Sequence, residues 1–244
     1  MSTYRELTYM AIDQLKQASD DSYFEAEHIV FLLDKYRALL LKQRYGDIRK
    51  SIPLSNYSTI TLDLTDDCTR VISVASQINY LDNTTNSSIV RTDVEIPSVI
   101  ALNHNFGVIK VNNASLDSSE LQFKGDFSFV SPERFNYVGE NKWLKKMVYA
   151  TLGVDNYVYL KSGGYDLSVL PSIQITALFE NPKDLTALMI PAVDDFMDMK
   201  YPLEEALVPP LLEMVIKDLL PAIYRPSDEV NNSNDDLDQM NVKK

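Results

Sequence analysis

Apolar residues recur at helical spacing in the first 50 positions of the chain. A Thr-x-x-Glu capping box begins at Thr3, where hydroxyl and carboxylate each satisfy an orphan backbone N–H. The apolar positions that follow it are Leu7, Met10, Ala11 and Leu15. Small and acidic residues at 18–22 then interrupt the pattern, and a second helix is predicted from about 25 to 45. Residues 1–50 are therefore predicted to form a helical hairpin.

The second predicted helix carries more apolar residues than one buried face needs. On a helical wheel one stripe can pack on the first helix and the core; it consists of Ile29, Leu32, Leu33, Tyr36, Leu39 and Leu40. A second strip, interrupted by Asp34 and Lys35, consists of Val30, Phe31, Ala38 and Leu41. Apolar area left in water costs about 25 cal/mol per Å² relative to burial. Burial by the chain itself and contact with a neighbouring subunit are the two explanations of this strip.

Between positions 51 and 180 the spacing becomes strand-like. Short β-branched runs alternate with spacers rich in Asn, Ser and Asp; among the runs are STITLDL, RVISVAS, VEIPSVIAL and FGVIKV. The clearest hairpin turns at Gly153–Asn156 and places Tyr157 and Tyr159 on one sheet face. Packing within the sheet is the favoured role of these tyrosines, with base stacking as the alternative. Further turns are predicted near Gly125 and at Gly139, the latter after a short helix.

The segment 181–224 returns to helical spacing. A helical turn with Pro182 in first position opens it, and the pair Pro209–Pro210 predicts a kink or two consecutive helices. Pro221 is predicted to break the last helix. The tail from 225 has almost no apolar content and is predicted to be disordered in isolation.

The order of these elements predicts an α+β fold. A helical hairpin (1–50) and a C-terminal helical segment (181–224) that packs on it accompany a β-rich middle domain (51–180). The middle domain is expected to be an antiparallel sheet with hairpins, or a barrel or sandwich. An extended, acidic and polar tail (225–244) completes the chain.

Charge narrows the choice of partners. The 244 residues include 35 acidic and 23 basic side chains, for a formal net charge of -12. Such a chain on average repels nucleic-acid backbones and anionic membranes. The start of the chain lacks a signal-peptide pattern, no apolar run reaches the roughly 18 residues of a membrane helix, and Cys68 is the only cysteine. These features predict a chain that folds in a reducing compartment, without a membrane partner.

The sequence shows no recognisable catalytic or metal-binding spacing. The two histidines, His28 and His104, are far apart, and acidic pairs such as Asp66–Asp67 lie in polar stretches that indicate a solvated surface. Gly163–Gly164 stands without the rest of a phosphate-binding loop. We therefore predict a structural protein, with no cofactor and no metal, rather than an enzyme.

Several segments resemble a family of virion proteins from crAss-like tailed phages of gut Bacteroides. They are YRELTYMAIDQLK, DDSYFEAEHIVFLLDKYRALLLKQRYGDI, IPLSNY, SPERFNYVG, YATLG, YVYLKS, FENP and PLEEALVPPLLEMVIKDLL. The resemblance spans most of the chain and is weakest over 66–120. Within that family the chain is similar to the first ring protein of the head-to-tail connector, the adaptor beneath the portal.

This resemblance implies a ring of about twelve copies at the head–tail junction of the virion, built in the cytoplasm of the bacterial host. Its partners are then copies of itself, the portal and further tail ring proteins, and DNA only passes through the lumen. A channel lined with carboxylates suits sliding DNA better than one lined with Lys and Arg, which explains the acid excess.

Two sets of residues become candidate contacts under this interpretation. The second strip of the long helix becomes a subunit interface formed by Val30, Phe31, Ala38 and Leu41. The tail becomes a portal-contacting arm with Arg225, Asp228, Glu229, Asp235 and Asp236.

Three other interpretations stay open. One is another tail ring or tail-hub protein of the same virion. Another is a β-rich carbohydrate-binding module that uses the tyrosine face. The last is a soluble enzyme with an unfamiliar site, for which a deep pocket with a perturbed acid or base would be needed.

Overall fold

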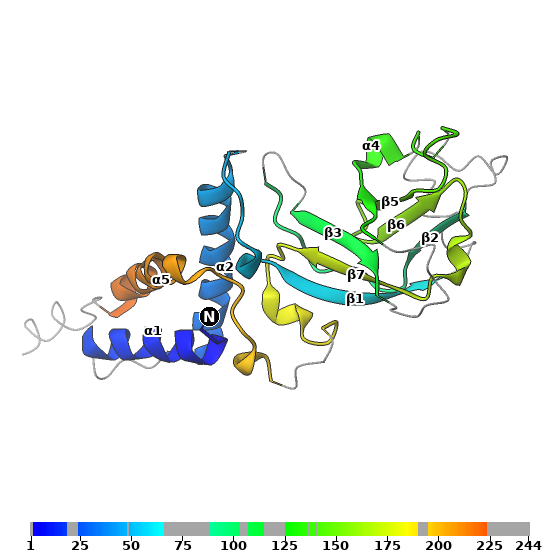
Figure 1. The fold of residues 1–244 in the computed structure, drawn as a ribbon. Helices are drawn as coiled ribbons and strands as arrows, with labels where there is room; N and C mark the ends of the chain where they lie inside the picture. Colours follow the sequence, from blue (N-terminus) through cyan, green and yellow to red (C-terminus); the bar gives the residue numbers. More distant parts are fainter. Residues whose placement is uncertain are drawn as a thin grey trace, which may run out of the picture.

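The computed structural model describes residues 2–18, 24–47, 49–65, 88–102, 107–114, 125–135, 137–139, 141–189 and 195–223. The molecule is elongated, with the three longest helices at one end and the strands at the other (Figure 1). The predicted α+β class is confirmed.

The first helix, α1 (Tyr4–Ala18), begins at the predicted capping box. The Glu6 N–H donates to the Thr3 hydroxyl at 3.2 Å, and the Thr3 N–H donates to the Glu6 carboxylate at 3.0 Å. The next helix, α2 (Ala26–Tyr45), crosses α1 steeply instead of lying antiparallel beside it (Figure 1). A helical hairpin was predicted over residues 1–50; both of its helices are present, but they cross at a steep angle (Figure 1).

The last helix, α5 (Val208–Ile223), packs on both α1 and α2. A 3₁₀ turn, η6 (Glu205–Leu207), precedes it, so the Pro209–Pro210 pair lies in the first turn of α5 and the prediction of two consecutive helices is confirmed. The predicted break at Pro221 is wrong, because α5 continues to residue 223. A proline this close to the helix end removes one backbone hydrogen bond of the last turn and leaves the earlier turns intact.

Seven strands form one sheet in the order β3-β7-β1-β2-β6-β5-β4. Neighbouring strands are antiparallel except for β4 and β5, which are parallel. The strands are β1 (Ser58–Thr65), β2 (Ser88–Thr92), β3 (Val108–Asn113), β4 (Ser128–Phe129), β5 (Val148–Leu152), β6 (Val158–Ser162) and β7 (Ser172–Ala177). The predicted RVISVAS run lies outside the described residues.

The sheet curls until its two edges meet. Asn112 of β3 bridges to Asp126, just before β4, and the Phe127 N–H donates to the Val111 carbonyl at 2.7 Å. The sheet therefore nearly closes into a barrel, which hides much of the edge that an open sheet exposes. Its interior holds the apolar side chains of alternating positions, such as Ile60, Leu62, Val158, Leu160, Ile173 and Ile175.

The predicted β5–β6 hairpin is confirmed, with the turn at residues 153–157. Val158 and Leu160 face the barrel interior, whereas Tyr159 packs on the outer side with Phe135 of α4 (Pro132–Phe135). Tyr157 packs against the same outer cluster, under the guanidinium of Arg91 at 4.3 Å from its ring centre. The sheet-packing role of the two tyrosines is thereby confirmed.

Candidate assembly surfaces

A buried arginine joins the helical end to the barrel. The Arg37 side chain on α2 is fully buried and donates to three backbone carbonyls: Pro202 at 2.8 Å, Phe179 at 2.7 Å and Asn56 at 3.1 Å. Asn56 in turn accepts a hydrogen bond from the Glu204 N–H at 2.7 Å. Because charge-assisted hydrogen bonds in a dry environment are strong, this arginine fixes α2 against segments that are distant in sequence.

A carboxylate is buried beside this arginine. Asp34 accepts a hydrogen bond from the Tyr4 hydroxyl at 2.6 Å, and the ring of Tyr4 meets that of Tyr201 edge to face. Burial raises the pKa of Asp34 to about 6, although the hydrogen bond from Tyr4 and the charge of Arg37 both lower it. Asp34 was expected only as a polar interruption of the second apolar strip, whereas in the structure its side chain is buried.

Most of the second apolar strip of α2 lies inside the chain. Val30 and Leu41 belong to the core formed with α1 and α5, and Ala38 is partly buried against it, so the assignment of Val30 and Leu41 to a subunit interface is wrong. The reason is that α1, α5 and the 196–203 segment together surround α2 on more than one side. Phe31 is 54% exposed, and its place in a subunit interface stays a prediction.

The exposed side of α2 instead combines Phe31 with Leu39, which was predicted to be buried. Lys35 lies between them, so the three residues recur at intervals of four and share one face. We call Phe31, Lys35 and Leu39 the outer α2 face. The helical wheel placed Leu39 in the stripe that packs on the first helix and the core, but the structure leaves this side chain exposed.

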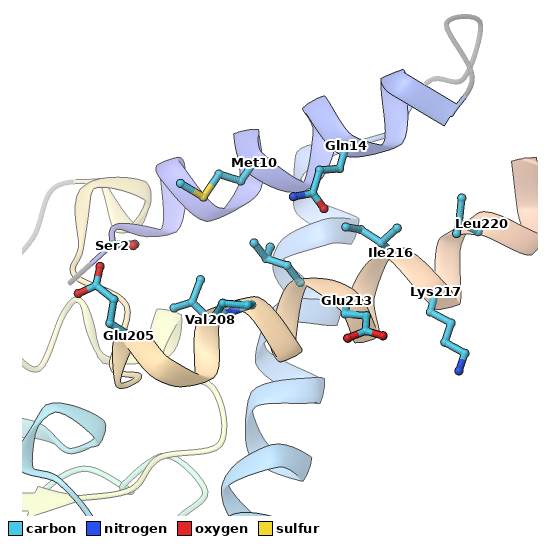
Figure 2. Close-up of a pocket in the computed structure, with 11 residues that line it drawn as sticks. Ser2, Met10, Gln14, Glu205, Val208, Glu213, Ile216, Lys217 and Leu220 are labelled. Carbon is cyan, nitrogen blue, oxygen red and sulfur yellow. The ribbon is translucent and has the colours of Figure 1, made fainter.

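An apolar groove runs between α1 and α5 (Figure 2). Met10 and Gln14 point into it from α1, opposite Val208, Ile216 and Leu220 of α5, and its volume is about 740 Å³. Three charged residues line its α5 side: Glu205, Glu213 and Lys217. We call this hollow the α1–α5 groove.

A basic and apolar loop projects at the barrel end. Every residue of 141–147, NKWLKKM, is exposed, and Trp143 is 85% exposed. The loop connects α4 with β5, far from α1 and α5 (Figure 1). Sequence reasoning missed this 141–147 loop, although the signal was present: the only tryptophan of an acidic chain stands among three lysines.

Several predicted residues lie in segments that the structure does not describe. Arg225, Asp228, Glu229, Asp235 and Asp236 lie outside the described residues, as do Cys68 and His104. Among the residues that the structure describes, no group of three His, Cys, Asp or Glu side chains could hold a metal ion. Within the same part of the chain, no helix combines the length and the apolar character needed to cross a membrane.

Two comparisons with known proteins cover nearly the whole chain. A family model described as phage tail ring protein 2 matches residues 6–237. A curated relative, "Ring protein 2" of Bacteroides phage crAss001, is 36% identical over 239 residues, which is 96% of this chain and 98% of the relative. Both names carry the number two, whereas the sequence resemblance implies the first ring protein; the crAss-like phage origin of the resemblance is confirmed.

Proposed function

Since the chain belongs to the phage tail ring protein 2 family, we propose that it assembles with copies of itself into a closed ring of the phage tail and acts there as a structural protein. The match over residues 6–237 carries this proposal, because it includes the helical end and the barrel together. A closed ring of identical subunits needs two different, complementary surfaces on each copy. The outer α2 face, the α1–α5 groove and the 141–147 loop are the candidates.

The resemblance found in the sequence supports finer features of this ring. They are about twelve copies, a lumen through which DNA passes during ejection, and a place at the head–tail junction. The net charge of -12 supports a DNA passage, because carboxylates add no counterion-release affinity for the phosphate backbone. The ring is expected to form in the host cytoplasm before it joins the particle.

Two placements along the tail axis are proposed, and each has its own partner. A ring directly beneath the portal would bind the portal, whereas a later ring of the same connector would bind another ring protein. The two placements differ in a pull-down: the purified chain, mixed with each candidate separately, should retain one of them at micromolar concentration. Retention of the other ring protein and not of the portal would overturn the adaptor placement.

The tail from Arg225 is the proposed arm for that axial contact. Its charges, carried by Arg225, Asp228, Glu229, Asp235 and Asp236, suit polar contacts on a partner surface. Deleting residues 225–244 should leave the mass of the homo-oligomer unchanged and weaken retention of the axial partner. An unchanged pull-down would remove the arm from the proposal.

Location in the particle tests the function directly. Antibodies raised against the barrel end, applied to purified virions and viewed with gold labels, should mark the tail close to the head. Label on the capsid, or none on intact and disrupted particles, would contradict a tail ring.

The carbohydrate-binding alternative loses support because Tyr159 is fully buried, so the tyrosine face is not open to a sugar.

A further inference from the structure

We propose that the 141–147 loop of one copy docks into the α1–α5 groove of the next copy. The inference rests on the proposed ring and specifies its subunit contact. The loop and the groove lie at opposite ends of the elongated molecule (Figure 1). A contact between two different surfaces at opposite ends is heterologous, which is the kind that closes identical subunits into a ring.

The loop has the composition of an interface centre. Trp143 is 85% exposed, and Leu144 and Met147 are exposed beside it. Tryptophan is enriched among the few residues that dominate binding energy, because a large aromatic side chain gains much from full burial. In a single subunit without neighbours, these three side chains are exposed to water.

The loop is held rigidly from below by glycines. Gly163, after β6, packs so closely on Gly139 that a Cβ at position 163 would collide with the Gly139 carbonyl oxygen. A Cβ at Gly164 would lie 2.8 Å from the carbonyl oxygen of Lys145. The glycine pair therefore clamps the loop at two points, Gly139 just before it and Lys145 within it, and this close packing accounts for the Gly163–Gly164 motif.

Hydrogen bonds within the loop add to this rigidity. The Leu144 N–H donates to the Asn141 carbonyl at 2.9 Å, the Trp143 N–H to the Asn141 side chain at 3.1 Å, and the Met147 N–H to the Leu144 carbonyl at 3.2 Å. A loop fixed before binding loses little conformational entropy when it docks.

The groove complements the loop in polarity and charge. Met10, Val208 and Ile216 give it an apolar lining that suits Trp143 and Leu144. Glu205 and Glu213 line it and suit the three lysines of the loop, while Lys217 is the one basic residue among the described residues that line it. Complementary charge around an apolar centre gives orientation and specificity to a contact.

A second copy is favoured over nucleic acid as the occupant of the groove and the partner of the loop. The lysines of the loop belong to a chain with a net charge of -12, so each neighbouring copy attracts the loop while the whole molecule repels a phosphate backbone. The apolar lining of the groove does not suit a phosphate backbone. A head-to-tail contact between two copies instead covers the loop of one copy and the groove of the next.

Two single variants and their mixture test the pairing. Trp143→Ala removes the centre of the loop, and Met10→Arg places a positive charge in the groove at a residue that is 47% exposed. Each variant should keep the wild-type circular dichroism and urea midpoint, yet associate at least tenfold more weakly, so that light scattering finds monomers. An equimolar mixture should form dimers, because one intact loop and one intact groove remain.

Val154→Ala is the matched control. Val154 is 95% exposed in the turn of the β5–β6 hairpin, whereas the loop lies before the other end of β5. The Val154→Ala chain should therefore form a ring of the wild-type mass. Rings that persist in both single variants, or a mixture that stays monomeric, would overturn the pairing and leave the ring proposal standing. Loss of duplex DNA binding in Trp143→Ala with intact rings would assign the loop to nucleic acid instead. A wild-type chain that stays monomeric would overturn the ring proposal together with this inference.

Discussion

Two regions of the molecule, the junction around Arg37 and the 141–147 loop, depart from the usual rule that charged side chains are exposed and large aromatic side chains are buried. At the junction a guanidinium is fully buried, and at the loop an indole is 85% exposed. The buried charge has three carbonyl partners on its own chain, so its contacts are complete in the single subunit. The exposed indole sits on a clamped loop with its apolar surface in water, which is a surface prepared for another molecule.

This difference separates residues that stabilise the subunit from residues that associate subunits. Changes at the junction and in the core should unfold the chain, whereas changes on the exposed surfaces should leave its stability unchanged. Stability and assembly can therefore be measured independently.

Leu41→Asp should cause the largest loss. Leu41 is fully buried in the helical core, and a carboxylate there has no partner, so more than about 4 kcal/mol of unfolding free energy should be lost. Phe31→Asp, on the outer α2 face, is the control and should change stability by less than about 0.5 kcal/mol. Urea unfolding followed by circular dichroism measures both. Equal losses would mean that the inside and outside of α2 are wrongly assigned.

Arg37→Met should lose about 3–5 kcal/mol, because three buried carbonyls lose their donor and Asp34 loses the neighbouring charge. Arg5 provides the comparison: it pairs with Asp195 and Asp198 on the exposed surface, and Arg5→Met should leave the urea midpoint nearly unchanged. A midpoint in Arg37→Met close to the wild-type value would show that the junction does not hold the two ends together.

Asp34→Asn should stabilise the chain in a pH-dependent way. The folded pKa of Asp34, about 6, lies above its ordinary value near 3.8. Between pH 6 and pH 4 the folded state therefore binds more protons than the unfolded state, so wild-type stability rises as pH falls from 7 to 4. The asparagine variant should be more stable by about 3 kcal/mol at pH 8 and similar at pH 4. Unfolding curves at both pH values measure the difference; a constant difference would contradict the raised pKa.

Gly163→Ala should have the smallest effect on the subunit, about 1–3 kcal/mol, because the added methyl group forces the backbone at Gly139 to move. The shift should also misplace the loop and weaken assembly. Gly153 is a useful comparison, since a methyl group there would meet the side chains of Asp155 and Tyr159 instead of backbone. Full assembly of a destabilised Gly163→Ala chain would show that the clamp does not position the loop.

Local patterns were readable from the sequence. The capping box at Thr3, the β5–β6 hairpin and the two consecutive helices at Pro209 depend on neighbouring residues, so local chemistry predicts them. The closure of the sheet through Asn112 and Asp126 was not readable, because it joins segments whose pairing depends on overall topology.

The polar junction was missed for a different reason. Arg37 and Asp34 have the composition of a solvated helix surface, and only the carbonyls of distant segments and the Tyr4 hydroxyl make their burial favourable. Helical periodicity also placed Leu39 in the core and Leu41 in the second strip. The structure shows the reverse, with Leu39 exposed and Leu41 buried, because α2 is surrounded on more than one side. The 141–147 loop stands out by its composition, a tryptophan among three lysines, and helical or strand periodicity does not detect composition.

The mass of the purified chain in solution tests the central claim most directly. Light scattering over a concentration series, up to hundreds of micromolar, should find a single closed oligomer with a fixed number of copies, near twelve, and electron microscopy should show its central hole. A chain that stays monomeric at every concentration, alone and in the presence of the portal and other ring proteins, would contradict a ring-forming role.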